Sequence, residues 1–342
     1  MKRLILKKIR FFSSVFVSVL LVLGWVSFKN ISQGDAASNT PTCDNPGWFP
    51  EDFGLKDHSV FDYNGYYYLV SNYVPPGDVS PLVQDRFAYA RSMDMCTWDE
   101  LDPVLATRTP GAWDEQAIWA PYVFLDGITY YMYYTGVTST GTQSIMLATT
   151  TSPSNPASWQ PQGMVFQPDH EGFVWEDGKW ADCRDPTVVK YEEKYYLYYT
   201  GSDVTGGIIG MAVSSDLKGP WIDQGGIVSP EPEAMLESPT IVRHGEYYYL
   251  IYNLASVGGY YRIGNNLDGP WQNPDEFRPG WAHEVWQNMA DDWYTSYLTD
   301  YTVTISPLTW DDFFDPPRLV VGGTVFHEFL PLILFNSDSN AK

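Results

Sequence analysis

The chain has 342 residues, of which 16% are aromatic and only 18% are charged. This composition excludes a disordered chain, because so many aromatic side chains can bury a large core. The 42 acidic residues outnumber the 20 basic ones, which gives a net charge of −22. Such a surface repels phosphate backbones and anionic membranes, so we expect no nucleic-acid partner and a neutral substrate; the same charge would also serve solubility alone.

Residues 1–37 differ from the rest of the chain. A basic front precedes an apolar run from Phe11 to Phe28, and Gly34-Asp35-Ala36 offers small residues for cleavage. The pattern is typical of a secretory signal peptide or an uncleaved membrane anchor. We therefore expect residues 38–342 to form one secreted, extracellular or cell-envelope domain, a monomer that contacts a membrane only through the N-terminal segment.

The chain contains three cysteines, Cys43, Cys96 and Cys183. They allow at most one disulfide bond and leave one thiol, and their spacing does not decide which pair is bonded. No Cys/His spacing resembles a zinc site, so we expect no metal ligands of that kind. Cys183 stands beside Arg184, where a small buried residue would fit.

A Tyr-rich run recurs along the chain and marks an internal repeat. Its copies are Tyr66–Leu69, Tyr130–Tyr134, Tyr195–Tyr199, Tyr247–Leu250 and the weaker Trp293-Tyr294. Most copies follow a tight-turn pair such as Asn64-Gly65, and each precedes a short strand and a turn that ends in Trp. Five units of roughly 45–65 residues predict an all-β fold, a five-bladed β-propeller.

The blades are expected to start near residues 57, 119, 184, 237 and 283. The apolar run Thr324–Phe335 could supply the missing outer strand that closes the ring, or pack over it.

Acidic residues recur at the start of these units. Asp57, Ala120 and Asp185 lie twelve residues before the central Leu or Met of their runs, Glu237 lies thirteen before its Leu, and His283 is the nearest match in the fifth unit. Equivalent positions of the inner strands converge on the central channel. Three carboxylates close together would repel one another and take different pKa values, which suits acid–base catalysis. Acids at blade starts can instead form hydrogen bonds that hold neighbouring blades together.

Several motifs resemble one known superfamily. They are Arg184-Asp185-Pro186 before a Tyr-rich strand, Glu237-Ser238-Pro239, Trp119-Ala120-Pro121 and the blade ending Ser215–Trp221. Together they resemble the arabinanase, β-xylosidase and invertase superfamily of five-bladed propellers, most closely glycoside hydrolase family 43.

The resemblance implies hydrolysis of O-glycosidic bonds in a neutral glycan of the arabinan or xylan type, acting on a polysaccharide or oligosaccharide. It implies Asp57 as general base, Asp185 as the acid that orients and tunes its partner, and Glu237 as general acid. Two departures concern the substrate and the base: His58 stands where the family usually has Pro after the first Asp, and Tyr122 follows Trp-Ala-Pro where the family often has an acid. Asp62 is the second candidate acid of the first unit.

The remaining candidates are expected to contact substrate. Arg184 would partly balance Asp185. Trp119 and Trp281 flank inner positions, where an indole face can stack on a sugar, although Trp in a β-protein is also a core residue. His283 could contact sugar, hold a structural hydrogen bond or serve a water-coordinated calcium ion in the channel, as His does in some members of the family. We expect no required cofactor.

Three other activities stay open on the same fold. An inverting glycosidase keeps its two carboxyl groups about 6.5–9.5 Å apart, whereas a retaining, invertase-like fructosidase would use the acid of the first blade as nucleophile. A glycan phosphorylase would need basic residues at the mouth, which this chain has few of. A non-catalytic carbohydrate-binding propeller would keep the aromatic residues but need no three acids.

Overall fold

The computed structural model describes residues 41–106, 109–228, 235–254, 257–278 and 280–322. The chain divides into two units, Met1–Ser38 and Asn39–Lys342, and all described residues belong to the second. No helix among them is long and apolar enough to cross a membrane. The predicted signal or anchor segment, and the predicted closing run Thr324–Phe335, lie outside the described residues.

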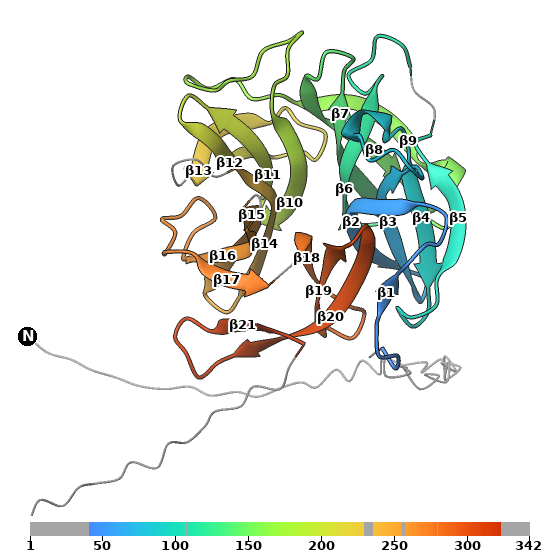
Figure 1. Ribbon diagram of the computed structural model, residues 1–342. Coiled ribbons are helices and arrows are strands. Elements are labelled where there is room, and N and C mark those ends of the chain that lie inside the picture. Colours follow the sequence, from blue (N-terminus) through green and yellow to red (C-terminus); the bar gives the residue numbers. More distant parts are fainter. Residues whose placement is uncertain (1–40, 107–108, 229–234, 255–256, 279, 323–342) are drawn as a thin grey trace, which may run out of the picture. The chain divides into compact units, whose positions relative to one another are not determined.

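Four sheets each consist of four antiparallel strands in sequence order (Figure 1). The first contains β2 (Gly54–Tyr63), β3 (Tyr66–Val74), β4 (Phe87–Ser92) and β5 (Asp99–Val104). The second contains β6 (Ala117–Asp126), β7 (Thr129–Val137), β8 (Gln143–Thr150) and β9 (Gln160–Phe166). The third contains β10 (Cys183–Tyr191), β11 (Lys194–Asp203), β12 (Gly206–Ser214) and β13 (Ile222–Val228). The fourth contains β14 (Leu236–His244), β15 (Tyr247–Leu254), β16 (Gly258–Gly264) and β17 (Asp275–Arg278). The 3₁₀ turns η1 (Pro81–Val83) and η2 (Pro156–Ser158) lie between strands.

The fifth sheet combines both ends of the described chain. It contains β18 (Trp281–Gln287), β19 (Trp293–Thr299), β20 (Thr302–Asp311) and two short outer strands, β1 (Gly47–Trp48) and β21 (Arg318–Val321). β1 pairs with β20 at Val303 and Thr304, and β21 pairs with β20 farther along. The five sheets confirm the predicted five-bladed β-propeller, and β1 joins the first part of the chain to the last blade.

A disulfide bond anchors the segment that precedes β1. Cys43 is bonded to Cys96, in the turn between β4 and β5, and Cys183 is a buried free thiol. The structure thus selects one of the three pairs that the sequence left open. The bond ties the strand that completes blade five to blade one.

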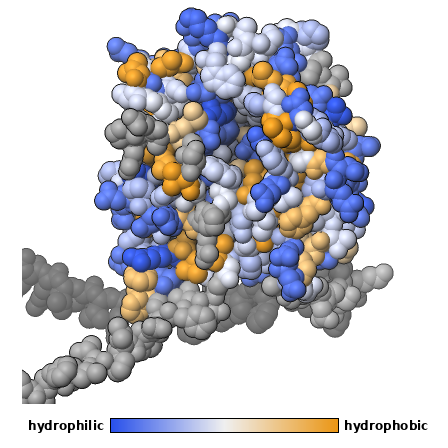
Figure 2. Space-filling view, in the orientation of Figure 1, coloured by the Kyte–Doolittle hydropathy of each residue, from blue (hydrophilic) through white to orange (hydrophobic). Residues whose placement is uncertain are grey.

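The Tyr-rich runs form the second strand of each blade because their side chains alternate between the two faces of a sheet. The Asn64–Gly65 turn before the first run has φ values of 51° and 81°, as a two-residue hairpin turn requires. Aromatic side chains then fill the space between neighbouring blades: the Phe61 ring lies 5.5 Å from that of Tyr130 in the next blade. On the face shown in Figure 2, hydrophilic side chains alternate with apolar patches.

Every inner strand carries a bulge at the same place. The five bulge residues have left-handed φ angles: 22° at Asp57, 48° at Ala120, 56° at Asp185, 52° at Ser238 and 49° at Ala282. The ladder to the second strand shifts register at each of them. Non-glycine residues in this region are strained, so a five-fold recurrence marks a feature that the whole ring maintains.

These bulges correct the predicted equivalence of Glu237 and His283 with Asp57. The equivalent residues are Ser238 and Ala282, and Glu237 stands one position earlier, where blade three has Arg184. In blade four the count of twelve leads from Leu250 to Ser238, and the acid Glu237 lies one residue before it. In blade five the turn before the Tyr-rich strand is longer than in the other blades, which shifts the count.

Candidate active site

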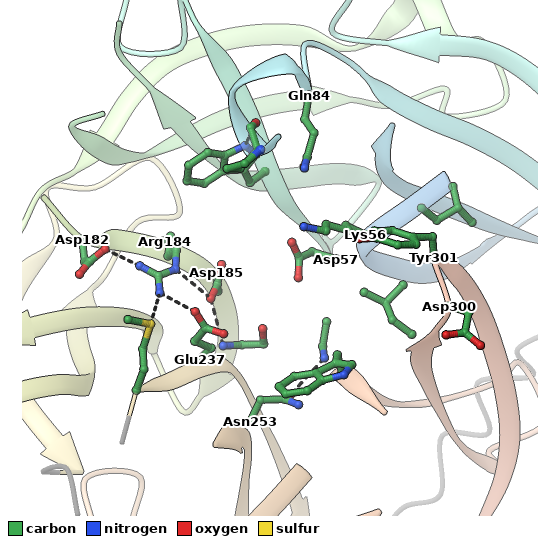
Figure 3. Close-up of a pocket in the computed structure, with 18 of the residues that line it drawn as sticks. Lys56, Asp57, Gln84, Asp182, Arg184, Asp185, Glu237, Asn253, Asp300 and Tyr301 are labelled. Carbon is green, nitrogen blue, oxygen red and sulfur yellow. Dashed lines mark hydrogen bonds and ion pairs between the residues drawn. The ribbon is translucent and has the colours of Figure 1, made fainter. Parts of the chain in front are cut away.

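A pocket of about 560 Å³ opens where the five inner strands begin (Figure 3). Asp57 on β2, Asp185 on β10 and Glu237 on β14 all line it. The structure therefore brings together the three carboxyl groups that the sequence predicted to converge. Asp62 does not line this pocket, because it lies near the far end of β2, where its backbone oxygen accepts a hydrogen bond from Tyr130.

Asp57 is held by an amide network. Its Oδ2 accepts a hydrogen bond of 3.0 Å from Nδ2 of Asn72, which also donates to Oε1 of Gln84 at 3.0 Å. Burial and the neighbouring Asp185 raise the pKa of Asp57 to about 7, while the Lys56 ammonium group opposes the rise. A carboxyl group that titrates near neutrality is suited to proton transfer.

Asp185 accepts two hydrogen bonds on one oxygen. Oγ1 of Thr200 donates to its Oδ2 at 2.9 Å, and the backbone N–H of Ser238 donates to the same atom at 3.0 Å. Burial raises the pKa of Asp185, and the Arg184 guanidinium group opposes this. The side chain is thus fixed between blades three and four beside Glu237.

Arg184 interacts with three carboxylates, whereas the sequence predicted an interaction with Asp185 alone. Its Nη2 donates to Oε1 of Glu237 at 2.7 Å and its Nη1 donates to Asp182, whereas its Nε lies 3.7 Å from Oδ2 of Asp185. Its head therefore connects three acids instead of balancing Asp185 alone. It lies in the pocket wall, where the sequence predicted a substrate contact.

Asp182 is a site residue that the sequence reasoning missed. Besides Arg184, it accepts hydrogen bonds from Ser202 and, at 3.2 Å, from Nε1 of Trp180. The available signal was an acid two residues before the Arg-Asp-Pro step and two residues after Trp180.

The predicted aromatic contacts differ in accessibility. Trp119 is only 6% exposed and donates through Nε1 to the backbone oxygen of Pro81 at 2.8 Å. Its ring lies 6.2 Å from that of Trp180, which is 56% exposed. Trp281, on the blade-five side, is 42% exposed. All three line the pocket, so Trp180 and Trp281 present the larger free surfaces to a ligand.

Other lining residues come from positions that no motif singled out. They include Lys56, Gln84, Asn253, Asp300 and Tyr301 (Figure 3). Lys56 occupies in blade one the position that Arg184 occupies in blade three, one residue before the bulge. That correspondence was the available signal, and it required the register of the inner strands.

His283 lies outside the lining of the central pocket. It is 1% exposed and lines a smaller cavity in the channel together with His58, Tyr122 and Glu284. Burial is the main reason that the pKa of His58 falls to about 3 and that of Glu284 rises well above its usual range. His283 therefore does not line the central pocket, although its smaller cavity shares Asp57 and Asp185 with that pocket.

The described channel residues do not form a set of direct ligands for a metal ion. The described residues contain no group of three His, Cys, Asp or Glu side chains arranged to hold one. Nε2 of His58 pairs with Ser296 at 2.7 Å, and Oε2 of Glu284 accepts the backbone N–H of Val60 at 3.1 Å. These two side chains are engaged by protein through those atoms, and a water-coordinated calcium ion beside His283 stays a prediction.

Residues 57–299 match the family model described as glycosyl hydrolases family 32 N-terminal domain. No curated protein sequence matches the chain. Among solved structures, a thermostable family-43 glycoside hydrolase is similar with a TM-score of 0.62 at 20% identity, over 82% of this chain and 96% of that one. A sucrose-6-phosphate hydrolase from Lactobacillus gasseri has a TM-score of 0.64 at 19% identity, over 81% and 62%.

An endo-arabinase from Bacteroides thetaiotaomicron has a TM-score of 0.57 at 16% identity, over 80% of this chain and 95% of that one. At such identities the solved structures share the fold with this chain. The resemblance to the superfamily of five-bladed glycosidase propellers is confirmed, and membership of family 43 in particular stays a prediction.

Proposed function

Because the chain belongs to the family of the glycosyl hydrolases family 32 N-terminal domain, we propose that it hydrolyses O-glycosidic bonds of a neutral oligosaccharide or polysaccharide of the arabinan or xylan type. The observation that carries this proposal is the convergence of Asp57, Asp185 and Glu237 on one pocket with exposed Trp side chains in its wall. Two carboxyl groups that flank a sugar are what glycoside hydrolysis requires.

In the proposed reaction Asp57 takes a proton from water, whose oxygen attacks the anomeric carbon. The bond from that carbon to the leaving oxygen breaks, and Glu237 gives its proton to this oxygen. Asp185 positions the sugar and disfavours a second negative charge nearby, because like charges repel at short range. A pKa of about 7 for Asp57 favours its use in proton transfer, since such a base is matched to neutral conditions.

Arg184 gives Glu237 a defined position before substrate enters. The ion pair of 2.7 Å uses the carboxylate form of Glu237, so this contact has to loosen when Glu237 carries the proton. The side chain of Glu237 is 30% exposed, so a glycosidic oxygen can reach it. Asp182 keeps the guanidinium group in place during that change.

The retaining, fructosidase-type reaction is the second candidate, and the match to the family 32 model favours it. There the Asp57 carboxylate would attack the anomeric carbon while the bond to the leaving oxygen breaks and Glu237 protonates that oxygen. Water, which gives a proton back to Glu237, would then displace Asp57 from the sugar. A phosphorylase is less suited to this pocket, because phosphate would need free basic side chains. The pocket lining contains two basic residues, Lys56 and Arg184, and Arg184 is already engaged by three acids. A purely binding propeller has no use for the three carboxyl groups.

The test is product analysis on arabinan, xylan and fructan and on aryl glycosides of the same sugars. Cleavage of one of the polysaccharides supports the proposal, and a protein that binds but never cleaves any of them refutes it. NMR of the first-formed product decides the mechanism: an inverted anomer supports Asp57 as base, and a retained anomer makes it a nucleophile.

We propose that the protein acts outside the cytoplasmic membrane as a monomer. The Cys43–Cys96 disulfide supports this location, because such bonds persist in oxidising surroundings. Alkylation of free thiols in protein taken directly from the native source, followed by mass measurement, tests it: a bonded pair is expected, and two reduced cysteines would contradict it.

A further inference from the structure

A second cavity of about 490 Å³ adjoins the central pocket on the blade-five side. Trp281, Leu298 and Asp300 line both cavities, so the two hollows meet at these residues. The wall of the second cavity continues along β19 and β20 to Tyr297 and Ser306. Its volume is in the range of about 300–1,000 Å³ that is usual for ligand sites.

The lining combines one large aromatic face with a few polar groups. Trp281 leaves 42% of its surface exposed at the junction, where an indole can cover the apolar face of a sugar ring. The hydroxyl groups of Tyr297 and Ser306 lie 3.4 Å apart and offer hydrogen bonds to sugar hydroxyls. Leu298 supplies an apolar floor. This is the chemistry of a neutral sugar site.

The charge of the cavity lining further limits which ligands can bind. Asp300 is the charged side chain among the described residues that line the second cavity, and no basic side chain accompanies it there. A glycan with carboxylate or phosphate groups would be repelled by Asp300, whereas a neutral glycan can donate hydroxyl hydrogen bonds to it.

The rim between the two cavities is preformed at an energetic cost. Asp300 and Tyr301 are the two turn residues between β19 and β20, and both have left-handed φ angles, 49° and 62°. This conformation is strained in Tyr, and such strain gathers at ligand sites. The backbone oxygen of Tyr301 accepts the N–H of Leu55 at 2.7 Å, and the Lys56 ammonium group lies 5.9 Å from its ring, so the turn is fixed to blade one.

From the shared wall, the exposed indole and the fixed rim, we propose that the substrate cleft continues from the catalytic pocket across Trp281 into this blade-five cavity. The cavity binds a further sugar unit of a neutral glycan chain, which makes an oligosaccharide of at least three units the preferred substrate. This proposal rests on the proposed glycosidase function of the central pocket.

The test compares chain lengths. The probes are arabinan-, xylan- or fructan-derived oligosaccharides of two to six units, from whichever polysaccharide is cleaved, and an aryl glycoside of the same sugar. For the wild type, kcat/KM should rise at least about tenfold from the dimer to the longest chain. Ser306→Trp, which fills the cavity, should abolish that rise and leave the aryl glycoside rate within about twofold.

Ser306→Thr is the matched control, because it changes the same position, keeps the hydroxyl group and does not fill the space, and it should keep most of the rise. Thr299→Trp, at an exposed position on the same cavity wall, provides an independent second block in case Ser306→Trp fails to fold. An unchanged length dependence in the folded Trp variants, or no rise in the wild type, overturns the extended cleft. Absence of cleavage of every probe by the wild type instead overturns the glycosidase function itself.

Discussion

Replacing Asp57 by Asn should abolish catalysis and at the same time stabilise the protein. Burial and Asp185 raise the pKa of Asp57 from 3.8 to about 7, so the folded protein holds a carboxylate that it disfavours. At about 1.4 kcal/mol per pKa unit this amounts to about 4 kcal/mol as an upper limit. Water in the pocket screens part of the effect, so we expect a measured gain of about 1–3 kcal/mol.

The sign follows from proton linkage. Between pH ~4 and ~7 the unfolded chain has lost the Asp57 proton while the folded chain keeps it, so the wild type loses stability as the pH rises. Asp57→Asn removes this dependence. Its advantage over the wild type should therefore be near zero at pH 4, grow up to pH 7 and stay constant above.

Urea unfolding of both proteins at pH 4, 5, 6, 7 and 8 measures this. The amide keeps an oxygen that can accept the hydrogen bond from Asn72, so the change removes charge and little else. Asp300→Asn, at an exposed position on the pocket rim, is the matched control and should leave the pH dependence unchanged. A gain that does not vary with pH, or a loss of stability at pH 8, would refute the assignment of a raised pKa to Asp57.

Four further predictions concern the same molecule. Lys56→Met should shift the acid limb of the pH profile of kcat/KM to higher pH, because the ammonium group lowers the pKa of Asp57. An acid limb at unchanged pH would show that Lys56 does not act on Asp57 in solution. Glu237→Gln should reduce hydrolysis by about 10²–10⁴-fold for poor leaving groups and much less for acidic aryl leaving groups, and equal losses in a comparison of both would remove Glu237 as the acid. Asp57→Asn should harm both substrate types alike if water needs its base. Cys43→Ser should lower the free energy of unfolding by about 4 kcal/mol in the chain-entropy account for a loop of 53 residues, whereas a loss of similar size on Cys183→Ser would contradict a special role of the Cys43–Cys96 bond.

The blades could be predicted because their signal is local. The Tyr-rich run and the turn before it, as at Asn64-Gly65, define a hairpin within about ten residues, and repetition of a local pattern identifies a ring of blades. The closure of the ring was harder to predict. β1 contributes only two residues, Gly47 and Trp48, and its partner β20 lies more than 250 residues away. A two-residue strand carries no periodicity.

The sequence predicted that the acids of the site converge, but it did not predict which residues surround them. Asp57 and Asp185 occupy equivalent bulges, so a fixed count from the hairpin reaches them. Glu237 belongs to the preceding position, and only the register of β14 against β15 reveals this. Asp182 comes from the segment between blades two and three, and Gln84 comes from the loop between β3 and β4 of blade one. No repeat relates the residues of such loops to one another, so the sequence gives no rule for placing them.

The bulges explain how five short strands supply so many groups to one pocket. In a regular strand, consecutive side chains point to opposite faces, but a bulge lets two neighbours reach the same side. Blade one thus delivers Lys56 with Asp57, and blade three delivers Arg184 with Asp185. The two pairs occupy equivalent positions but have different partners. Arg184 is engaged by Asp182 and Glu237, whereas Lys56 forms no ion pair among the described residues. Engagement of Arg184 fixes the position of Glu237, whereas burial and Asp185 raise the pKa of Asp57 to about 7 against the opposing Lys56 ammonium group.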